Sequence, residues 1–270
     1  KPPLFNVFTP SPDEQRLLRR LSRRTWAFFE VHVRPQENWL PPDNMQEQPE
    51  IAIAHRTSPT NMGLALLGNL AAYDLGYLTA ARLVDRTAAA LQTMQGMERY
   101  RGHFYNWYDT RSLEPLRPRY VSAVDSGNLA GHLLTLRSGL IALPDDPVYD
   151  KRMFDGLHDT LELLREAVTT EQPENTDMLL TIVAELDAAI TTPPVTLPVA
   201  ADSVKKMLDR VEKVAIGLGG VAGDDVGFWL QLLLLQCRDA SDYLAVFAGL
   251  SDAREGGGKK GIPTLRQAAN

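Results

Sequence analysis

The sequence has little cysteine, no long apolar run and no excess of basic residues, and each shortage excludes a class of protein. The single cysteine, Cys237, excludes an internal disulfide and a zinc site built from several thiolates. No stretch approaches the roughly 20 apolar residues that cross a bilayer, since the nearest, 226–237, is interrupted by Gln231 and Gln236. A net charge of −6 argues against a nucleic-acid partner, because phosphate binding needs a basic surface.

Several enzyme motifs are also missing. The sequence contains no phosphate-binding loop with its following Lys-Ser or Lys-Thr, no GxSxG turn and no HExxH helix. The glycines of 254–261 do not lie between a strand and a helix, and His55, His103 and His132 follow no metal-ligating spacing. We therefore expect no cofactor, no metal and no nucleic-acid partner.

What the sequence does contain is helical periodicity. With 44% hydrophobic and 23% charged residues it is typical of a globular chain, and two short extended pieces, 51–54 and 119–124, do not make a sheet. Helices are expected at 13–32, 60–75, 79–98, 126–142, 147–170, 174–191, 200–218 and 224–250. The prediction is an all-α fold of antiparallel helical hairpins.

The ends of the chain point to an excised piece of a longer protein. Residues 1–14 lack both an initiator methionine and the pattern of a signal peptide, and the Gly-rich tail is typical of a flexible linker. The expected divisions are an extension at 1–12, a helical domain at 13–250 with its motifs in 13–142 and a less distinctive helical part at 143–250, and a linker at 251–270.

Two connectors, 33–59 and 99–125, are longer than bare loops inside compact domains usually are. Successive hairpins would make the helices that start near Thr60 and Ser126 run in the same direction. The polar cluster before each helix and the aromatic connector would then share one end of the bundle. Arg, Asp, Asn and His side chains beside Trp and Tyr rings suit sugar hydroxyls and ring faces.

A purely structural interpretation stays open beside this one. Ser58, Thr60 and Asn61 are good helix caps, and Asp125 or Ser126 would suit the later helix. The aromatic residues of the connector would then plug the bundle end, and Arg56 would pair with an acid.

The segments 23-RRTWAFFE-30, 38-NWLPPDNMQE-47, 54-AHRTSPTNMGLALL-67 and 98-ERYRGHFYNWYDTRSLEPLRPRYVSAVDSGNLAGHLL-134 resemble the central part of bacterial cyclic β-1,2-glucan synthases. The resemblance is specific over about residues 15–142 and diffuse beyond. It implies a partial (α/α)6-barrel-like array, as in six-hairpin glycosidases and glucoamylases. It also implies a parent protein in the inner membrane, with this soluble region on the cytoplasmic side.

By this resemblance, the chain binds glucan in the region that transglycosylates linear β-1,2-glucan into rings, with other domains of the same polypeptide as partners. The residues expected to line the glucan cleft are His55, Arg56, Asn61, Trp107, Tyr108, Asp109, Asp125 and Asn128. A retaining reaction needs two carboxyl groups about 5–5.5 Å apart, and no convincing pair is found. The catalytic residues stay unassigned, and the piece alone is expected to be inactive.

The alternative function is a helical adaptor that docks the membrane glycosyltransferase onto soluble domains without touching substrate. It is motivated by a basic stripe on the first helix, spaced by three and four residues so as to face anionic lipid. The stripe consists of Arg16, Arg19, Arg20, Arg23 and Arg24.

Overall fold

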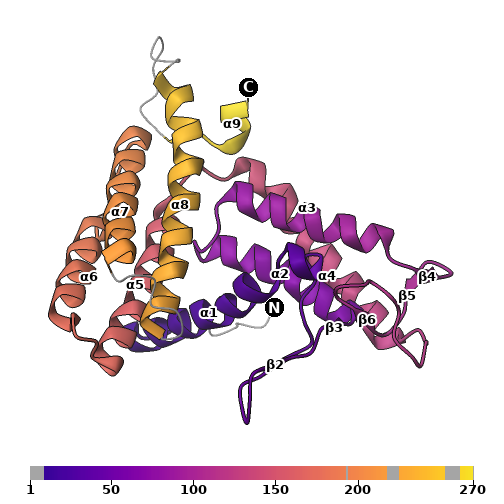
Figure 1. The fold of residues 1–270 in the computed structure, drawn as a ribbon. Coiled ribbons are helices and arrows are strands. Elements are labelled where there is room, and N and C mark those ends of the chain that lie inside the picture. Colours follow the sequence, from indigo (N-terminus) through magenta and orange to yellow (C-terminus); the bar gives the residue numbers. More distant parts are fainter. Residues whose placement is uncertain (1–8, 193, 218–224, 253–261, 270) are drawn as a thin grey trace.

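The computed structural model describes residues 9–192, 194–217, 225–252 and 262–269, and these are mostly helical (Figure 1). The α-helices are α1 (Pro12–His32), α2 (Pro59–Asp74), α3 (Ala80–Gly96), α4 (Ala123–Ala142), α5 (Lys151–Glu171), α6 (Thr176–Ile190), α7 (Leu197–Gly217), α8 (Asp225–Asp252) and α9 (Leu265–Ala269). Two 3-10 turns, η1 (Pro35–Glu37) and η2 (Leu143–Asp145), follow α1 and α4. The predicted all-α class is confirmed.

Strands in the described residues are two residues long and lie in the two long connectors. They are β1 (Met45–Gln46), β2 (Ala52–Ile53), β3 (Arg56–Thr57), β4 (Arg99–Tyr100), β5 (His103–Phe104) and β6 (Tyr108–Asp109). They form three separate antiparallel pairs, β1–β2, β3–β6 and β4–β5. The short strand pairs therefore order the connectors, and they supply hydrogen-bond partners for part of the connector backbone without forming a larger sheet.

Several helix ends differ from the prediction. The helix expected from 126 begins at Ala123, because Ser122 is the cap and its hydroxyl accepts the N–H of Asp125 at 3.1 Å. The caps expected at Asp125 or Ser126 were therefore wrong. Part of the expected linker forms α9, whose Arg266 pairs with Asp145 at 2.8 Å, while residues 253–261 lie outside the described part.

The helices form two packed groups, each with its own core, and Leu70 and Leu140 pack against both cores. Helices α5 to α8 stand side by side, and α2, α3 and α4 extend away from them (Figure 1). The β4–β5 pair lies beyond the far end of α3, and the β1–β2 hairpin projects to one side. Leu157, Leu161 and Leu233 are fully buried in the larger core. Met62 and Leu66 lie in the smaller core, against which residues of both connectors pack, such as Leu40 and Tyr108.

Helices α2 and α4 run in the same direction, as the connector argument requires. Thr60 lies against Asp125 near both N-termini, and contacts further along join Gly63 to His132. A Cβ on Gly63 would come within 2.3 Å of the His132 ring, so glycine lets the two helices approach closely. The predicted shared direction is confirmed, and it brings both N-termini to one end.

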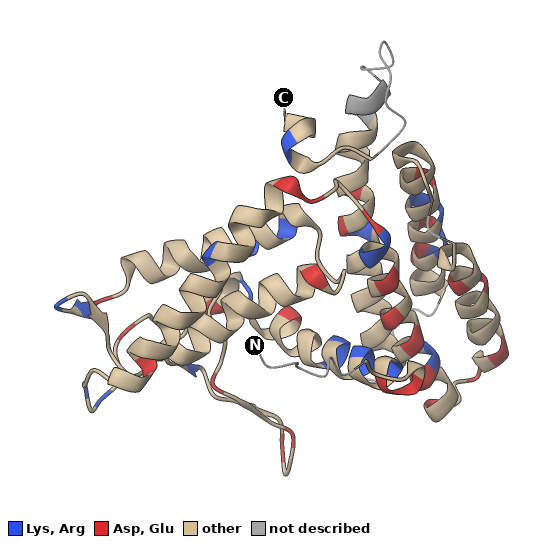
Figure 2. Cartoon of the chain, turned by 180° about the vertical axis from the view of Figure 1, so that it is seen from behind, with Lys and Arg blue, Asp and Glu red and all other residues tan. Residues whose placement is uncertain are grey.

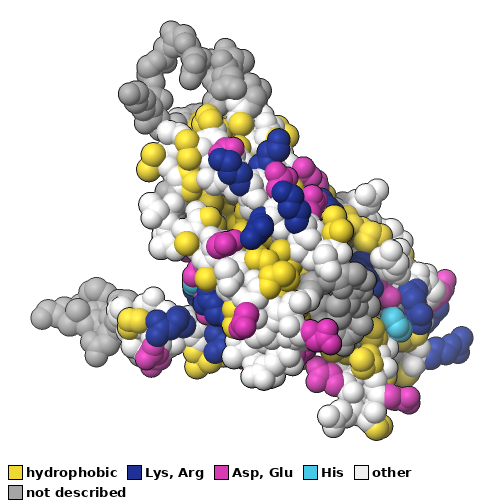
Figure 3. Space-filling model, turned by 60° about the vertical axis from the view of Figure 1, so that its left-hand side comes forward, with side chains coloured by type: hydrophobic (Ala, Val, Ile, Leu, Met, Phe, Trp, Pro, Cys, Tyr) yellow, Lys and Arg dark blue, Asp and Glu magenta, His cyan; other side chains and the backbone are white. Residues whose placement is uncertain are grey.

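The basic stripe of α1 does not form a free surface. Arg19 binds Asp159 at 2.8 Å, and Arg20 and Arg24 both reach Glu166, at 2.5 and 3.4 Å. The acidic partners lie on α5, so these pairs fasten α1 to the larger helix group. Figure 2 marks acidic and basic positions along the ribbon, and Figure 3 shows acidic and basic side chains next to one another on the surface.

The other two members of the stripe are also occupied. Arg23 is fully buried and donates to Glu30 at 3.0 Å, and Arg16 pairs with Asp13. The arginines are thus paired within the chain, but the side chains of Arg16, Arg20 and Arg24 are still 67%, 44% and 46% exposed, so the contact with anionic lipid stays a prediction. No helix in the described ranges combines the length and apolar content needed to cross a bilayer.

Candidate functional site

The two long connectors meet at the N-terminal ends of α2 and α4. Pairing of β3 with β6 places Arg56 opposite Asp109 and Thr57 opposite Tyr108. Thr57 and Tyr108 are fully buried, which anchors this ladder in the smaller core. The residues that the sequence placed at one end of the bundle therefore do come from adjacent backbone.

Asp125 is the centre of one part of this surface. Its Oδ1 accepts the hydroxyl of Thr60 at 2.6 Å, and the amide of Asn128 donates to the same Thr60 oxygen at 3.1 Å. In the amide orientation that satisfies its neighbours, Asn106 donates to Asp125 Oδ2 at 3.1 Å. Asp125 thus joins α2, α4 and the aromatic connector.

Asp43 organises the adjoining part of the surface. Its Oδ2 accepts Arg56 Nη2 at 2.9 Å, and its Oδ1 accepts the amide of Asn61 at 3.3 Å. The Arg56 guanidinium lies over the Trp107 ring, 4.8 Å from the centroid, in a cation–π contact. Trp107 Nε1 in turn donates to the Asn106 amide oxygen at 2.5 Å, so the two parts are continuous.

His55 belongs to a neighbouring but different cluster. Its Nδ1 lies 3.0 Å from Glu37 Oε1 without the alignment of a hydrogen bond. Glu37 also accepts the hydroxyl of the buried Thr110, whose carbonyl accepts the amide of Asn38 at 2.8 Å. These contacts tie η1 to the aromatic connector beside the surface of Asp125 and Asp43.

Two of the predicted cleft residues, Tyr108 and Asp109, make contacts within the chain instead of lining a cleft. Tyr108 is fully buried, and its hydroxyl accepts the N–H of Tyr105 and donates to the carbonyl of Glu98, both at 2.7 Å. A ligand cannot reach its ring, so the prediction that Tyr108 lines a cleft was wrong. Asp109 turns toward its own loop, where Oδ1 accepts the N–H groups of Ser112 at 2.8 Å and Arg111 at 2.9 Å.

The turn around Asp109 should make stability depend on pH. Its N–H bonds, with Ser112 the largest contributor, lower the pKa of Asp109 below its usual value. An acid whose pKa is lowered by folding stabilises the folded state at pH values above the pKa that it has in the unfolded chain. This stabilisation is lost as the pH falls through the pKa of the acid in the folded state. Asp109→Asn should therefore lower the free energy of unfolding at pH 7 and have less effect at pH 3. Urea unfolding at pH 7 and pH 3 measures this, with Glu114→Gln in the same loop as the control. An equal loss of unfolding free energy in Asp109→Asn at the two pH values would contradict the prediction.

Sequence reasoning missed four members of the surface: Asp43, Thr60 as a contact of Asp125, Asn106 and Tyr120. Each is a chain neighbour of a predicted residue or lies in one of the two long connectors. Their roles depend on contacts across 13 to 68 residues of sequence, such as Arg56 with Asp43 and Asn128 with Thr60. No local spacing signals such contacts.

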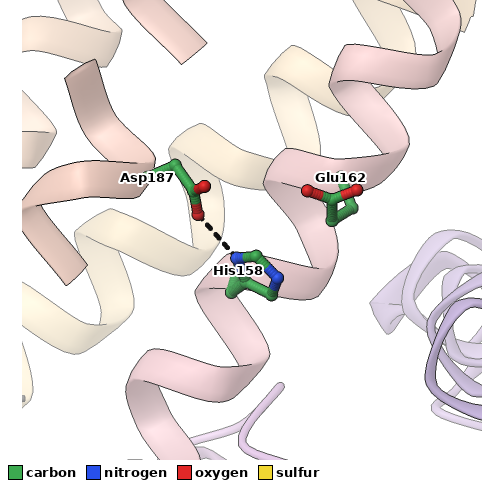
Figure 4. A group of neighbouring side chains, drawn as sticks. All are labelled: His158, Glu162 and Asp187. Atoms are coloured by element: carbon green, nitrogen blue, oxygen red, sulfur yellow. Dashed lines mark hydrogen bonds and ion pairs between the residues drawn. The ribbon is translucent and has the colours of Figure 1, made fainter. Parts of the chain in front are cut away.

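A second group of titratable side chains lies between α5 and α6 (Figure 4). One ligand atom each from His158, Glu162 and Asp187 falls within 4.8 Å of the others, and His158 Nδ1 is 2.6 Å from Asp187 Oδ1. Arg165 already supplies a positive charge, since it binds Glu162 and also Asp187 at 3.3 Å. We interpret the group as an ion-pair network that joins the two helices.

The fold and this surface define an all-helical protein whose parallel helices α2 and α4 present hydrogen-bonding groups and aromatic rings at one end. In sequence it is similar to the cyclic β-(1,2)-glucan synthase NdvB of Rhizobium meliloti (strain 1021), with 43% identity over 159 residues. This similarity covers 58% of the chain but 6% of that much longer protein, and it confirms the resemblance predicted from the motifs. The sequence matches no established family profile.

Two solved structures are similar to part of the chain. One is a protein described as a glucoamylase from Bacteroides fragilis NCTC 9343, with 14% identity and a TM-score of 0.34 over 67% of this chain and 36% of that one. The other, so described from Bacteroides caccae ATCC 43185, has 15% identity and a TM-score of 0.30 over 63% and 36%. Both scores lie below 0.5, so neither match places a residue of this chain in a glucoamylase site.

Proposed function

We propose that this chain is a glucan-binding segment of a cyclic β-1,2-glucan synthase and contributes to the region that transglycosylates linear β-1,2-glucan into rings. The observation that carries the proposal is the continuous polar and aromatic surface built by Asp43, Arg56, Asn61, Asn106, Trp107, Asp125 and Asn128. The sequence similarity to NdvB supports it, because a protein with that name handles β-1,2-linked glucan.

The surface has the chemistry that a sugar chain requires. Arg56 is half exposed. Its Nε and Nη2 donate to Asp43, and its Nη1 has no hydrogen-bond partner among the described residues. Asn128 is exposed and donates its side-chain amide N–H to Thr60, and its side-chain oxygen accepts no hydrogen bond from the described residues. Fixed donors and acceptors beside aromatic rings are suited to the hydroxyls and apolar faces of glucose.

The same contacts favour holding a glucan over cleaving it. Both oxygens of Asp125 and both oxygens of Asp43 accept hydrogen bonds from side chains of this chain. A general acid needs an environment that keeps a carboxyl protonated, and a nucleophile needs an unobstructed oxygen. We therefore propose that these carboxylates position neighbouring groups, that the reacting pair lies elsewhere in the longer polypeptide, and that this segment alone is inactive.

Loss of Asp125 or Trp107 should weaken binding. Asp125→Ala removes the acceptor that holds Thr60 and Asn106, and Trp107→Ala removes the ring under Arg56. Each should weaken affinity for a β-1,2-linked gluco-oligosaccharide by roughly tenfold, the effect of one lost anchoring contact. Isothermal calorimetry would measure this, with the exposed Asp202→Asn on α7 as control. Unchanged affinity in both site variants would exclude this surface as the binding site.

The basic stripe of α1 gives the adaptor function less support than its spacing suggested, because the α1 arginines bind acidic residues of the same chain. A different observation favours an additional scaffolding role.

Helix α4 packs on α2 by one side and leaves three apolar side chains at the surface. These are Val124, Leu134 and Ile141, which are 72%, 68% and 56% exposed. An apolar helix usually buries such side chains, and co-purification of a Leu134→Glu variant with adjoining segments of the polypeptide would test this role. Unimpaired co-purification would count against it.

A further inference from the structure

The aromatic rings of the proposed surface differ in how much of each is available. Tyr108 is fully buried, and Trp107 carries the Arg56 guanidinium 4.8 Å from its ring centroid. A glucosyl unit that packs against an aromatic ring needs an uncovered face. Tyr108 therefore offers no uncovered face, and Arg56 covers one face of Trp107.

Tyr120 does offer an uncovered ring at this place. It is 49% exposed, and among the described residues no other ring or guanidinium is stacked on it. Its backbone carbonyl accepts the N–H of Asn106 at 2.9 Å, and its hydroxyl donates to the Asn106 amide oxygen at 2.7 Å. A surface tyrosine fixed at both backbone and hydroxyl has already lost much of the side-chain freedom that binding would cost.

Asn106 connects this ring to the centre of the surface. Its side chain is 6% exposed, and the amide that accepts the Tyr120 hydroxyl also donates to Asp125 Oδ2 at 3.1 Å. The same amide oxygen accepts Trp107 Nε1. The buried amide therefore sets the positions of Tyr120 and Trp107 relative to Asp125.

We propose that Tyr120 is the aromatic platform of the site, against which one glucosyl unit of a β-1,2-glucan packs, and that Asn106 holds this ring in place. The proposal rests on the glucan-binding function proposed above and names the ring that carries it. The exposed Asn128 is joined to Asp125 through Thr60, and its side-chain oxygen would accept hydrogen bonds from the sugar hydroxyls.

Three variants test the platform by calorimetry with a β-1,2-linked gluco-oligosaccharide. Tyr120→Leu keeps an apolar side chain but removes the ring, and it should weaken binding by roughly fivefold or more. Tyr120→Phe keeps the ring but removes the hydroxyl by which Asn106 holds it, so it should bind more weakly than the wild type and more tightly than Tyr120→Leu. Tyr100→Leu is the matched control, since Tyr100 is 52% exposed on the nearby hairpin of β4 and β5, and it should bind like the wild type.

The outcomes separate this inference from the proposed function. Wild-type affinity in Tyr120→Leu together with weak binding in Asp125→Ala would overturn the platform and leave the glucan site standing. Equal losses in Tyr120→Leu and Tyr120→Phe would also overturn it, because the hydroxyl and not the ring would then be the contact. No binding by the wild type would remove both proposals. Thermal unfolding of each variant would show that weak binding does not come from a lost fold.

Discussion

Gly156→Ala should lower the free energy of unfolding by about 3 kcal/mol or more. Gly156 lies on α5 where the turn between α2 and α3 crosses it, and an added Cβ would fall 2.1 Å from the carbonyl oxygen of Gly76. The contact is with backbone, so no side-chain rotation can relieve it. Gly76 has a φ of +82°, and its own Cβ would fall 1.7 Å from the carbonyl of Arg152. The two glycines therefore let the smaller helix group attach to the larger one.

The control for this prediction is Gly131→Ala on α4. A Cβ at Gly131 would meet nothing within 4 Å, and alanine favours a helix over glycine by about 0.5–1 kcal/mol. Chemical denaturation should therefore show the two substitutions moving stability in opposite directions. A Gly156→Ala protein as stable as the wild type would show that the close crossing between the two helix groups is not present in solution.

Arg23→Met should lower the free energy of unfolding by roughly 3–5 kcal/mol, the usual cost of breaking a buried ion pair from one side. Arg23 is 0% exposed and donates to Glu30 at 3.0 Å and to Thr160 at 2.7 Å. It also lies over the rings of Tyr77 and Trp229, at 5.4 and 5.5 Å. Burial raises the pKa of Glu30, and the positive charge of Arg23 opposes that rise. The single variant therefore leaves the Glu30 carboxyl without its ion-pair partner.

A second substitution separates charge from packing in this prediction. Arg23→Met combined with Glu30→Gln should recover more than half of the lost stability, because no uncompensated carboxylate then remains. Arg16→Ala is the exposed control and should change stability by less than about 0.5 kcal/mol, since Arg16 is 67% exposed. Equal losses in Arg16→Ala and Arg23→Met would contradict the structural role assigned to Arg23.

Much of the helical framework could be predicted because its signals are local. Ser11 and Glu14 form a capping box at the start of α1, with Pro12 in its first turn, and Ser58 with Pro59 starts α2. Apolar periodicity gave the lengths of the helices. The direction of successive hairpins gave the meeting of two N-termini, which the contact of Thr60 with Asp125 confirms.

The individual roles within the candidate site could not be predicted in the same way. Tyr108 and Tyr120 are both connector tyrosines, yet pairing of β6 with β3 buries the first and leaves the second on the surface. The α1 arginines have the spacing of a solvent-facing stripe, but the acidic partners of Arg19, Arg20 and Arg24 lie on α5, about 140 residues away in the chain. Which partner a charge finds depends on tertiary packing, which spacing within one helix does not encode.

The most direct test of the account is to locate the glucan on the chain. Amide resonances recorded by nuclear magnetic resonance during titration with a β-1,2-linked gluco-oligosaccharide should shift around Asp43, at 56–61, at 105–108 and at 120–128, including the side-chain amides of Asn61, Asn106 and Asn128. Resonances of α6 and α7 should stay unchanged. Shifts confined to α6 and α7, or no shifts at saturating oligosaccharide, would contradict a glucan site at the N-terminal ends of α2 and α4.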